Sequence, residues 1–377
     1  MLTSTILAPW VLGAAVLAPS PIAAPVVAPV VAPARTVAVD VQDKNKDKSD
    51  KYDKDKSDKD KSDKDQDKDR EKTRDRWRDR SRGAEQTEHL TRAFPVGANA
   101  SLFLNNIAGD IIIKGVPGNE IRVEALKHGK GSSDDDARGQ MQNIQVTMNE
   151  VGGRVEVKTF HSGRNNRGWV DFTISVPTAT RVEVQSVSGD LQLQNVKGEL
   201  RGETVSGDVT GAGLGRVASL KTMSGNVRVN GVESDGPLAL SAMSGDLTIE
   251  NLKARSVDAN SISGSVTLKS CTCDRVHLES VSGDLEYAGQ ITRSGRYEIK
   301  THSGGIRLIV PSVSGFEIDA NSFSGDIAFD PPITTILSQG RKGPMPGRTA
   351  HGVIGNGGAF VELSSFSGDI VVNRGGK

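Results

Sequence analysis

The chain has 377 residues, a formal net charge of zero, 42 glycines and only 4% aromatic residues. Residues 43–82 hold 14 of the 47 acidic and 17 of the 47 basic side chains, which leaves 33 acidic and 30 basic residues elsewhere. The part expected to fold is therefore mildly acidic, and this excludes a global electrostatic attraction to nucleic acid. Abundant glycine and few aromatic residues favour a thin core of Val, Leu, Ile and Ala.

The N-terminus resembles an export signal, and residues 1–34 are predicted to form a signal-like leader. An uncharged apolar run from Leu2 to Ala18 is near signal-peptide length and is short for a membrane span. Ala32-Pro33-Ala34 supplies an Ala-x-Ala cleavage sequence, although no Lys or Arg precedes the apolar run. We expect export. The alternatives are an uncleaved leader that anchors the chain in a membrane, and a cytosolic chain with an Ala/Pro-rich start.

Residues 35–92 are predicted to be a disordered linker rich in Lys, Asp and Arg. Between Asp43 and Arg82 the segment has almost no apolar side chains, so burial cannot offset the conformational entropy that ordering would cost. Its end, from Arg74 to Arg82, is richer in Arg and contains Trp77. This end could bind an anionic surface, but we favour a solvated spacer.

Residues 93–180 are predicted to form an irregular β cap at the N-terminal side of a repeat domain. Apolar and polar residues alternate here without a strict period, as expected for a terminal element that protects an open stack. Ala108-Gly109-Asp110 is a degenerate copy of the triplet described next, and Gly152-Gly153 predicts a hairpin. We expect the segment from Ser132 to Asp136 to be an exposed turn.

Residues 181–377 carry a Ser-Gly-Asp triplet that recurs every 18 to 21 residues, with a last copy 43 residues after the one before. A fixed period of this size is typical of stacked repeats. Some copies replace the Asp by Asn, Ser or Gly. The copies are Ser188-Gly189-Asp190, Ser206-Gly207-Asp208, Ser224-Gly225-Asn226, Ser244-Gly245-Asp246, Ser263-Gly264-Ser265, Ser282-Gly283-Asp284, Ser303-Gly304-Gly305, Ser324-Gly325-Asp326 and Ser367-Gly368-Asp369.

Each repeat has the pattern of two short strands joined at the triplet. Small or apolar residues occupy alternate positions on both sides of it, which is typical of half-buried strands, and the Gly indicates a bend. We predict an all-β fold, a β-solenoid of stacked repeats of about 19–21 residues with Ser-Gly-Asp corners and a rung spacing of about 4.8 Å. An antiparallel β-sandwich is the alternative, but it would not require a constant triplet period.

The segment 331–358 interrupts the last period of the repeat. It contains Pro344, Pro346 and several glycines, and we predict a loop insertion from one rung. Long loops on rigid scaffolds often carry function, so this loop is a candidate functional region.

The triplet aspartates are the sharpest candidate for chemistry, because stacking would align them along one edge. Stacked carboxylates could bind Ca²⁺, but the converging set of six to eight oxygens that Ca²⁺ requires is not evident in the sequence. We favour an Asp that accepts backbone N–H groups at the corner. A second column, two residues before each triplet Ser, is predicted to form a buried hydroxyl ladder. Its members are Ser186, Thr204, Thr222, Ser261, Ser280, Thr301, Ser322 and Ser365.

No catalytic motif breaks the repeat pattern. The six His residues are scattered, and His302, which replaces an apolar residue next to Ser303, is predicted to be structural. Cys271 and Cys273 would lie on one face of a strand, further apart than disulfide geometry favours, so we expect structural or free thiols. The sequence predicts no enzyme, no cofactor and no metal site.

The Val-Ser-Gly-Asp-Leu units resemble a bacterial family of putative adhesins. The resemblance rests on these units, on Trp169-Val170-Asp171-Phe172-Thr173-Ile174-Ser175-Val176-Pro177 before them and on residues 355–369 at the end, and it covers about 93–377. It implies exported proteins built from β-strand repeats, with no established activity and no catalytic residues to transfer.

The expected function is that of a non-enzymatic, exported protein of the cell surface or periplasm, or a secreted one, adhesin-like or scaffolding. Its partner would be an unknown envelope or surface ligand, protein or polysaccharide, and not nucleic acid. An N-terminal cap favours a monomer. The alternatives are an envelope-stress sensor that acts through a partner and, less favoured, a polysaccharide-acting β-helix enzyme.

Overall fold

The computed structural model describes residues 83–163, 166–311, 315–330, 334–336 and 348–375. The expected leader and the Lys/Asp-rich tract lie outside these residues. All described strands join in one hydrogen-bonded network of 23 strands, accompanied by one short helix. Within the described residues, no helix has the length and apolarity needed to cross a membrane.

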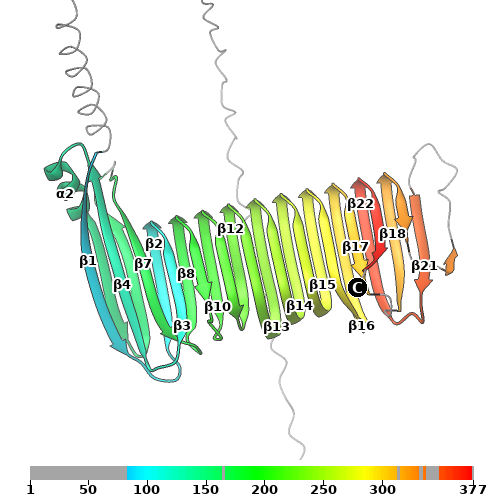
Figure 1. Ribbon diagram of the computed structural model, residues 1–377, viewed down its shortest axis with the longest axis horizontal. Coiled ribbons are helices and arrows are strands. Elements are labelled where there is room, and N and C mark those ends of the chain that lie inside the picture. The colour runs from blue at the N-terminus through cyan, green and yellow to red at the C-terminus, as the bar shows by residue number, and fades with distance from the viewer. Residues whose placement is uncertain (1–82, 164–165, 312–314, 331–333, 337–347, 376–377) are drawn as a thin grey trace, which may run out of the picture. The chain divides into compact units, whose positions relative to one another are not determined.

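The central part of the network is a stack of rungs, each with two arms that meet at a triplet (Figure 1). Strand β8 (Arg181–Ser188) ends at the triplet Ser, and β9 (Leu191–Gln194) begins directly after the triplet Asp. The following rungs repeat this plan. They are formed by β10 (Leu200–Ser206), β11 (Val209–Leu214), β12 (Val217–Ser224), β13 (Val227–Ser244), β14 (Leu247–Ser263), β15 (Val266–Ser282), β16 (Leu285–Ser303) and β17 (Ile306–Val310).

The rungs pair in parallel and in register, so equivalent residues lie above one another. Ser206 lies opposite Ser188 in one neighbour and Ser224 in the other. Parallel stacking of this kind confirms the β-solenoid and excludes the antiparallel sandwich.

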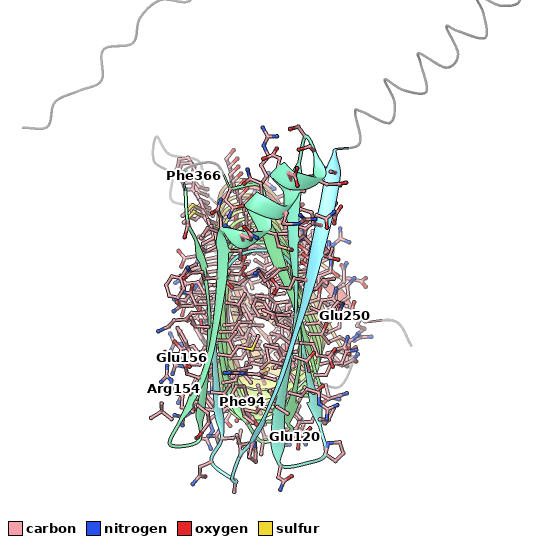
Figure 2. All side chains as sticks on the ribbon, turned by 90° about the vertical axis from the view of Figure 1, so that its left-hand side faces the viewer. Phe94, Glu120, Arg154, Glu156, Glu250 and Phe366 are labelled. Carbon is pink, nitrogen blue, oxygen red and sulfur yellow. The ribbon has the colours of Figure 1, made fainter. Side chains whose placement is uncertain are left out.

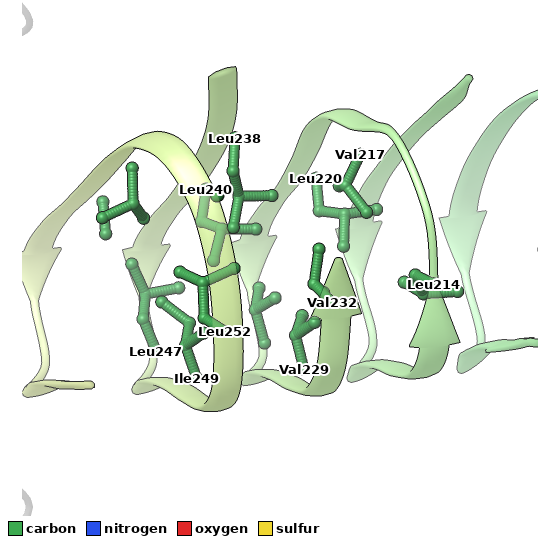
Figure 3. Packing of buried hydrophobic residues seen from close by; sticks show 14 of the residues in the cluster. Leu214, Val217, Leu220, Val229, Val232, Leu238, Leu240, Leu247, Ile249 and Leu252 are labelled. Atoms are coloured by element: carbon green, nitrogen blue, oxygen red, sulfur yellow. The ribbon is translucent and has the colours of Figure 1, made fainter. Parts of the chain in front are cut away.

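The core is a thin layer of mostly aliphatic side chains between the two faces of the stack, with Phe172, Tyr287, Tyr297 and Phe316 fully buried among them. Leu240 lies between Leu220 and Ala259 on adjacent strands, and all three are at most 1% exposed. Figure 3 shows the same stacking for Val229 and Ile249 on the other arm. Seen along the stack, the side chains fill the space between the faces, and Glu156 and Glu250 project from opposite sides (Figure 2). One rung could not bury its apolar face alone, which is why the columns recur.

Antiparallel strands cover the N-terminal end of the stack. They surround a rung made of β2 (Ser101–Ala108) and β3 (Ile111–Val116), which pairs in parallel with β8 and β9 on one side and with β6 and β7 on the other. On one face, β5 pairs antiparallel with β6. On the other face, β4 pairs antiparallel with β7, and β1 pairs antiparallel with β4. The bounds are β1 (Ala84–Pro95), β4 (Glu120–Gly131), β5 (Ile144–Val151), β6 (Arg154–His161) and β7 (Trp169–Pro177).

Two expectations for this end are corrected. Strand β1 begins at Ala84, inside the segment 35–92 that was expected to be a disordered linker, because its backbone pairs along its whole length with β4. The segment from Ser132 to Asp136 is not a simple turn. Ser133 caps helix α2 (Asp134–Gln142) and accepts a hydrogen bond from the Asp136 N–H at 3.2 Å. Acidic residues in the first turn favour this helix start.

The C-terminal rungs do not stack in sequence order. The rung of β22 (Ala359–Ser367) and β23 (Ile370–Arg374) pairs with β16 and β17 on one side. On its other side it pairs with β18 (Phe316–Ser324) and β19 (Ile327–Phe329). The last triplet of the chain therefore lies between the triplets of Ser303 and Ser324.

The segment 331–358 is not only a loop insertion. Its described part contains β21 (Arg348–Ile354), which pairs antiparallel with β18, and β20 (Thr334–Ile336), which pairs antiparallel with β21. These strands cover the edge of β18, which would otherwise offer unpaired backbone groups. The chain then returns and inserts its last rung.

Candidate functional site

The triplet aspartates form hydrogen bonds between rungs. The backbone N–H of Asp190 donates to Oδ1 of Asp110 at 2.9 Å, and that of Asp208 donates to Oδ1 of Asp190 at 2.9 Å. The same bond joins most neighbouring rungs along the stack. In each of the further pairs, the backbone N–H of the first residue donates to Oδ1 of the second: Asp110–Asp171, Asn226–Asp208, Asp246–Asn226, Ser265–Asp246, Gly305–Asp284 and Asp326–Asp369.

This geometry supports the interpretation of the Asp column as a corner device. The N–H of Asn226 lowers the pKa of Asp208, desolvation opposes this shift, and the hydrogen bond from Arg228 adds to it. In the part of the chain that the structure describes, no three His, Cys, Asp or Glu side chains gather to hold a metal ion. The Ca²⁺ alternative therefore finds no ligand set there.

The Ser/Thr column is buried, and all its hydroxyls except that of Thr204 donate to backbone carbonyls. The hydroxyl of Thr222 donates to the Gly207 carbonyl at 3.3 Å, and that of Ser280 donates to the Gly264 carbonyl at 3.2 Å. These hydroxyls satisfy glycine carbonyls of the preceding rung, which gives the column a structural role.

The two cysteines lie in the core, and His302 lies on the surface. Cys271 and Cys273 are both buried, and desolvation raises their pKa values to about 12 and about 11. Thiols held protonated in this way are poor nucleophiles. His302 stacks on Phe366, with ring centroids 4.8 Å apart and planes 8° apart.

His302 belongs to a surface feature that the sequence analysis missed. The residue directly before each triplet Ser is exposed, and in eight rungs it is apolar, with 38% to 51% of its surface accessible. We call these residues the apolar stripe. In stacking order they are Val187, Val205, Met223, Met243, Ile262, Val281, Phe366 and Phe323, with His302 between Val281 and Phe366.

In-register pairing makes the stripe continuous, with a rise of about 4.8 Å per rung. Phe366 stacks on Phe323 at 4.7 Å as well as on His302, and it lies at the upper edge in Figure 2. Single exposed apolar residues are ordinary, but a continuous apolar patch marks an interaction site. The sequence contained a signal for this stripe. The residues two and four before each Ser point inward, so the residue directly before the Ser points outward, where a polar residue would be expected. An apolar residue at this outward position in most repeats is the signal.

A groove of about 480 Å³ runs beside the stripe across five rungs, from β10 to β15. Its two walls differ in chemistry. The apolar wall consists of Val205, Met223, Met243, Ile262 and Val281. The polar wall consists of Glu203, Lys221, Ser241, Asn260 and Glu279, each two residues before its partner in the apolar wall.

The parallel rungs, the repeated triplets and the groove lie in one segment that matches a known family. The model of the family described as Toastrack DUF4097 covers residues 99–373. The chain belongs to this family. Membership confirms the resemblance drawn from the repeats and agrees with the β-solenoid. None of the curated proteins matches the chain.

The chain also matches solved structures from several bacteria. A putative adhesin from Bacteroides fragilis is 14% identical, with 76% of this chain and 97% of that chain covered and a TM-score of 0.38. A putative cell adhesion protein from Clostridium sporogenes is 10% identical, with 77% and 100% covered and a TM-score of 0.22. A putative lipid-binding protein from Parabacteroides distasonis is 12% identical, with 77% and 97% covered and a TM-score of 0.35. At such TM-scores these structures inform neither the ligand nor the site of this chain.

Proposed function

We propose that this Toastrack protein is a non-enzymatic, exported binding scaffold of the cell envelope, adhesin-like in its action. The observation that carries the proposal is the apolar stripe with its groove. Eight half-exposed apolar side chains, stacked in register, leave hydrophobic surface in contact with water. Removal of this surface from water by a partner is favourable, so the stripe would contribute to the free energy of binding. A rigid stack holds the contacts at fixed spacing, so little conformational entropy is lost on binding.

Export is supported by the sequence of the N-terminus. The apolar run from Leu2 to Ala18 and the Ala-x-Ala sequence that ends at Ala34 have the character of a secretory leader. The charged tract from Asp43 to Arg82 would then separate the stack from the envelope as a solvated spacer.

Location is tested by trypsin treatment of intact cells that carry the protein with a C-terminal tag. The tract from Asp43 to Arg82 is dense in Lys and Arg and should be cleaved rapidly, while the hydrogen-bonded rungs resist. Release of a tagged fragment that begins near Arg82 supports surface display. Protection in intact cells, with cleavage only after permeabilisation, would contradict an adhesin.

Binding is tested with isolated envelopes of the producing cells and two charge variants. Met243 is 47% exposed in the stripe, and Val151 is 77% exposed on the hairpin between β5 and β6. Met243→Asp should reduce envelope binding about tenfold, because it places a charge in the centre of the contact, whereas Val151→Asp should bind like the wild type. Equal binding by the two variants would show that the stripe is not the binding surface.

A further inference from the structure

We infer that the groove beside the apolar stripe binds a neutral, extended, β-linked glycan chain. The inference rests on the proposed binding function and names the ligand class of the same surface. The groove is open and linear, and its volume of about 480 Å³ lies within the range of roughly 300–1,000 Å³ typical of ligand sites. A chain that runs along the stack meets equivalent side chains at every rung, and a β-linked pyranose advances by about one rung spacing.

The two walls match the apolar face and the hydroxyl-bearing edge of a sugar ring. Met223, Met243 and Ile262 offer apolar contact to the C–H groups of pyranose rings, and the flexible thioethers of Met adapt to an irregular surface. On the polar wall, Glu203 lies beside Lys221, and Lys221 lies beside Ser241 in the parallel register. Acceptor, donor and hydroxyl groups thus follow one another, as hydroxyl groups along a glycan require.

The charge of the polar wall favours a neutral ligand. The wall holds two carboxylates, Glu203 and Glu279, and one amine, Lys221. Within the described residues, neither Glu203 nor Lys221 forms an ion pair, whereas Oε2 of Glu279 lies 3.6 Å from Nε2 of His277. Glu203 and Lys221 therefore remain able to bond a ligand. A polyanion would meet the two carboxylates and a polycation would meet the lysine, whereas hydroxyl groups can pair with both.

One unsatisfied polar atom lies in the polar wall of this groove. The Asn260 amide nitrogen donates to Oδ1 of Asp258 at 2.7 Å, but its own Oδ1 is buried without a hydrogen-bond partner. Buried polar atoms are nearly always paired, so Oδ1 of Asn260 points to a polar occupant of the groove.

A second copy of the chain fits this surface less well. Nine rungs at about 4.8 Å and a width of about 10 Å give the stripe roughly 400 Å², about half of the roughly 800 Å² that each partner contributes to a stable protein interface. The triplet aspartates that run alongside would also add like charge to a self-contact.

The test is calorimetric titration of the full chain with three hexasaccharides: β-1,4-linked glucose, β-1,4-linked N-acetylglucosamine and, as a control, α-1,4-linked glucose. At least one β-linked hexamer should bind saturably and about tenfold more tightly than the coiled α-linked hexamer. Ser241→Trp fills the middle of the groove and should weaken binding about tenfold or more. Ser364→Trp, at the equivalent position of β22 outside the groove, should leave the Kd within about twofold.

Absence of saturable binding by both β-linked hexamers overturns the inference, as does equal weakening by Ser241→Trp and Ser364→Trp. If Met243→Asp still abolishes envelope binding in that case, the binding function stands and only the glycan assignment fails. Concentration-dependent dimers that Met243→Asp dissolves, without glycan binding, would identify a second copy as the occupant and would also overturn the inference.

Discussion

At most corners two independent constraints require the triplet glycine: its positive φ and the close approach of the neighbouring rung. At Gly245 φ is +147°, and a Cβ would overlap the carbonyl oxygen of Gly225 in the rung before. The same overlap recurs at Gly207 and Gly283. Because each such carbonyl lies where a methyl group would stand, alanine at these positions must push two rungs apart.

Gly245→Ala should lower the free energy of unfolding by about 2–4 kcal/mol, since it adds backbone strain to a steric overlap. Gly97→Ala is the matched control, because no atom lies within 4 Å of the position of its Cβ, and it should change stability by less than about 0.5 kcal/mol. Urea unfolding of the two variants and the wild type measures the difference. Similar midpoints for both variants would contradict the close approach of the rungs.

The triplet aspartate links stability to pH at the same corner. The pKa of Asp208 is lowered from its usual 3.8, first by the N–H of Asn226. A folded pKa below the unfolded value means that the ionised carboxylate stabilises the fold above about pH 3.8, and that this contribution is lost as pH falls through the folded pKa. Its amount is reduced by solvent, because the side chain is 37% exposed.

Asp208→Asn keeps an oxygen that can accept the N–H, as Asn226 does for Asp246, but removes the charge. The variant should be less stable than the wild type at neutral pH and should approach it as the pH falls below the usual pKa of Asp. Urea midpoints at neutral and acidic pH measure this convergence. Asp235→Asn, at an exposed carboxyl that forms no hydrogen bond or ion pair among the described residues, controls for general charge effects. A difference in midpoint that does not narrow in acid would refute the linkage.

At the scale of elements, both ends of the stack solve the same problem. A parallel rung leaves an edge of unpaired N–H and C=O groups, which invites further stacking with another chain. Antiparallel strands close these edges: β5 and β4 at the N-terminal end, and β21 at the C-terminal end. The rung with the degenerate triplet, β2–β3, has β6 and β7 on its outer side, and the last triplet rung of the sequence, β22–β23, has β18 and β19 on its outer side.

The rung order predicts which cysteine pairs can form disulfides. Lys300 of β16 lies directly beside Ser364 of β22, whereas Asn321 of β18 lies beside Ser364 on its far side. Lys300→Cys with Ser364→Cys should oxidise readily, because adjacent strands place the Cα atoms about 5 Å apart. Lys300→Cys with Asn321→Cys should not, because two rung spacings exceed the reach of a disulfide.

Mass spectrometry of the oxidised proteins distinguishes the two orders. If rungs followed the sequence, the pair at 300 and 321 would be adjacent and would form the disulfide instead. Cys271 and Cys273 are buried with raised pKa values, so they should not compete for the engineered thiols.

For the whole molecule, the sequence by itself determined the repeat architecture. Alternating apolar positions, a constant period and a glycine at each corner all act locally or between nearest neighbours, and parallel stacking in register is their shared solution. The sequence predicted an Asp that accepts backbone N–H groups at its own corner, whereas the N–H groups that it accepts belong to the neighbouring rung.

Only the tertiary structure decided the rung order, the ends and the candidate surface. Pairing of β22 between β16 and β18 joins segments that are far apart in the chain, and no local pattern specifies such a choice. Strand β1 has few apolar residues and forms because β4 offers it an edge. The stripe consists of ordinary Val, Met, Ile and Phe residues whose meaning depends on direction: in a strand the same side chain is core or surface according to the face it occupies, and here the stack turns one outward column into a continuous apolar line.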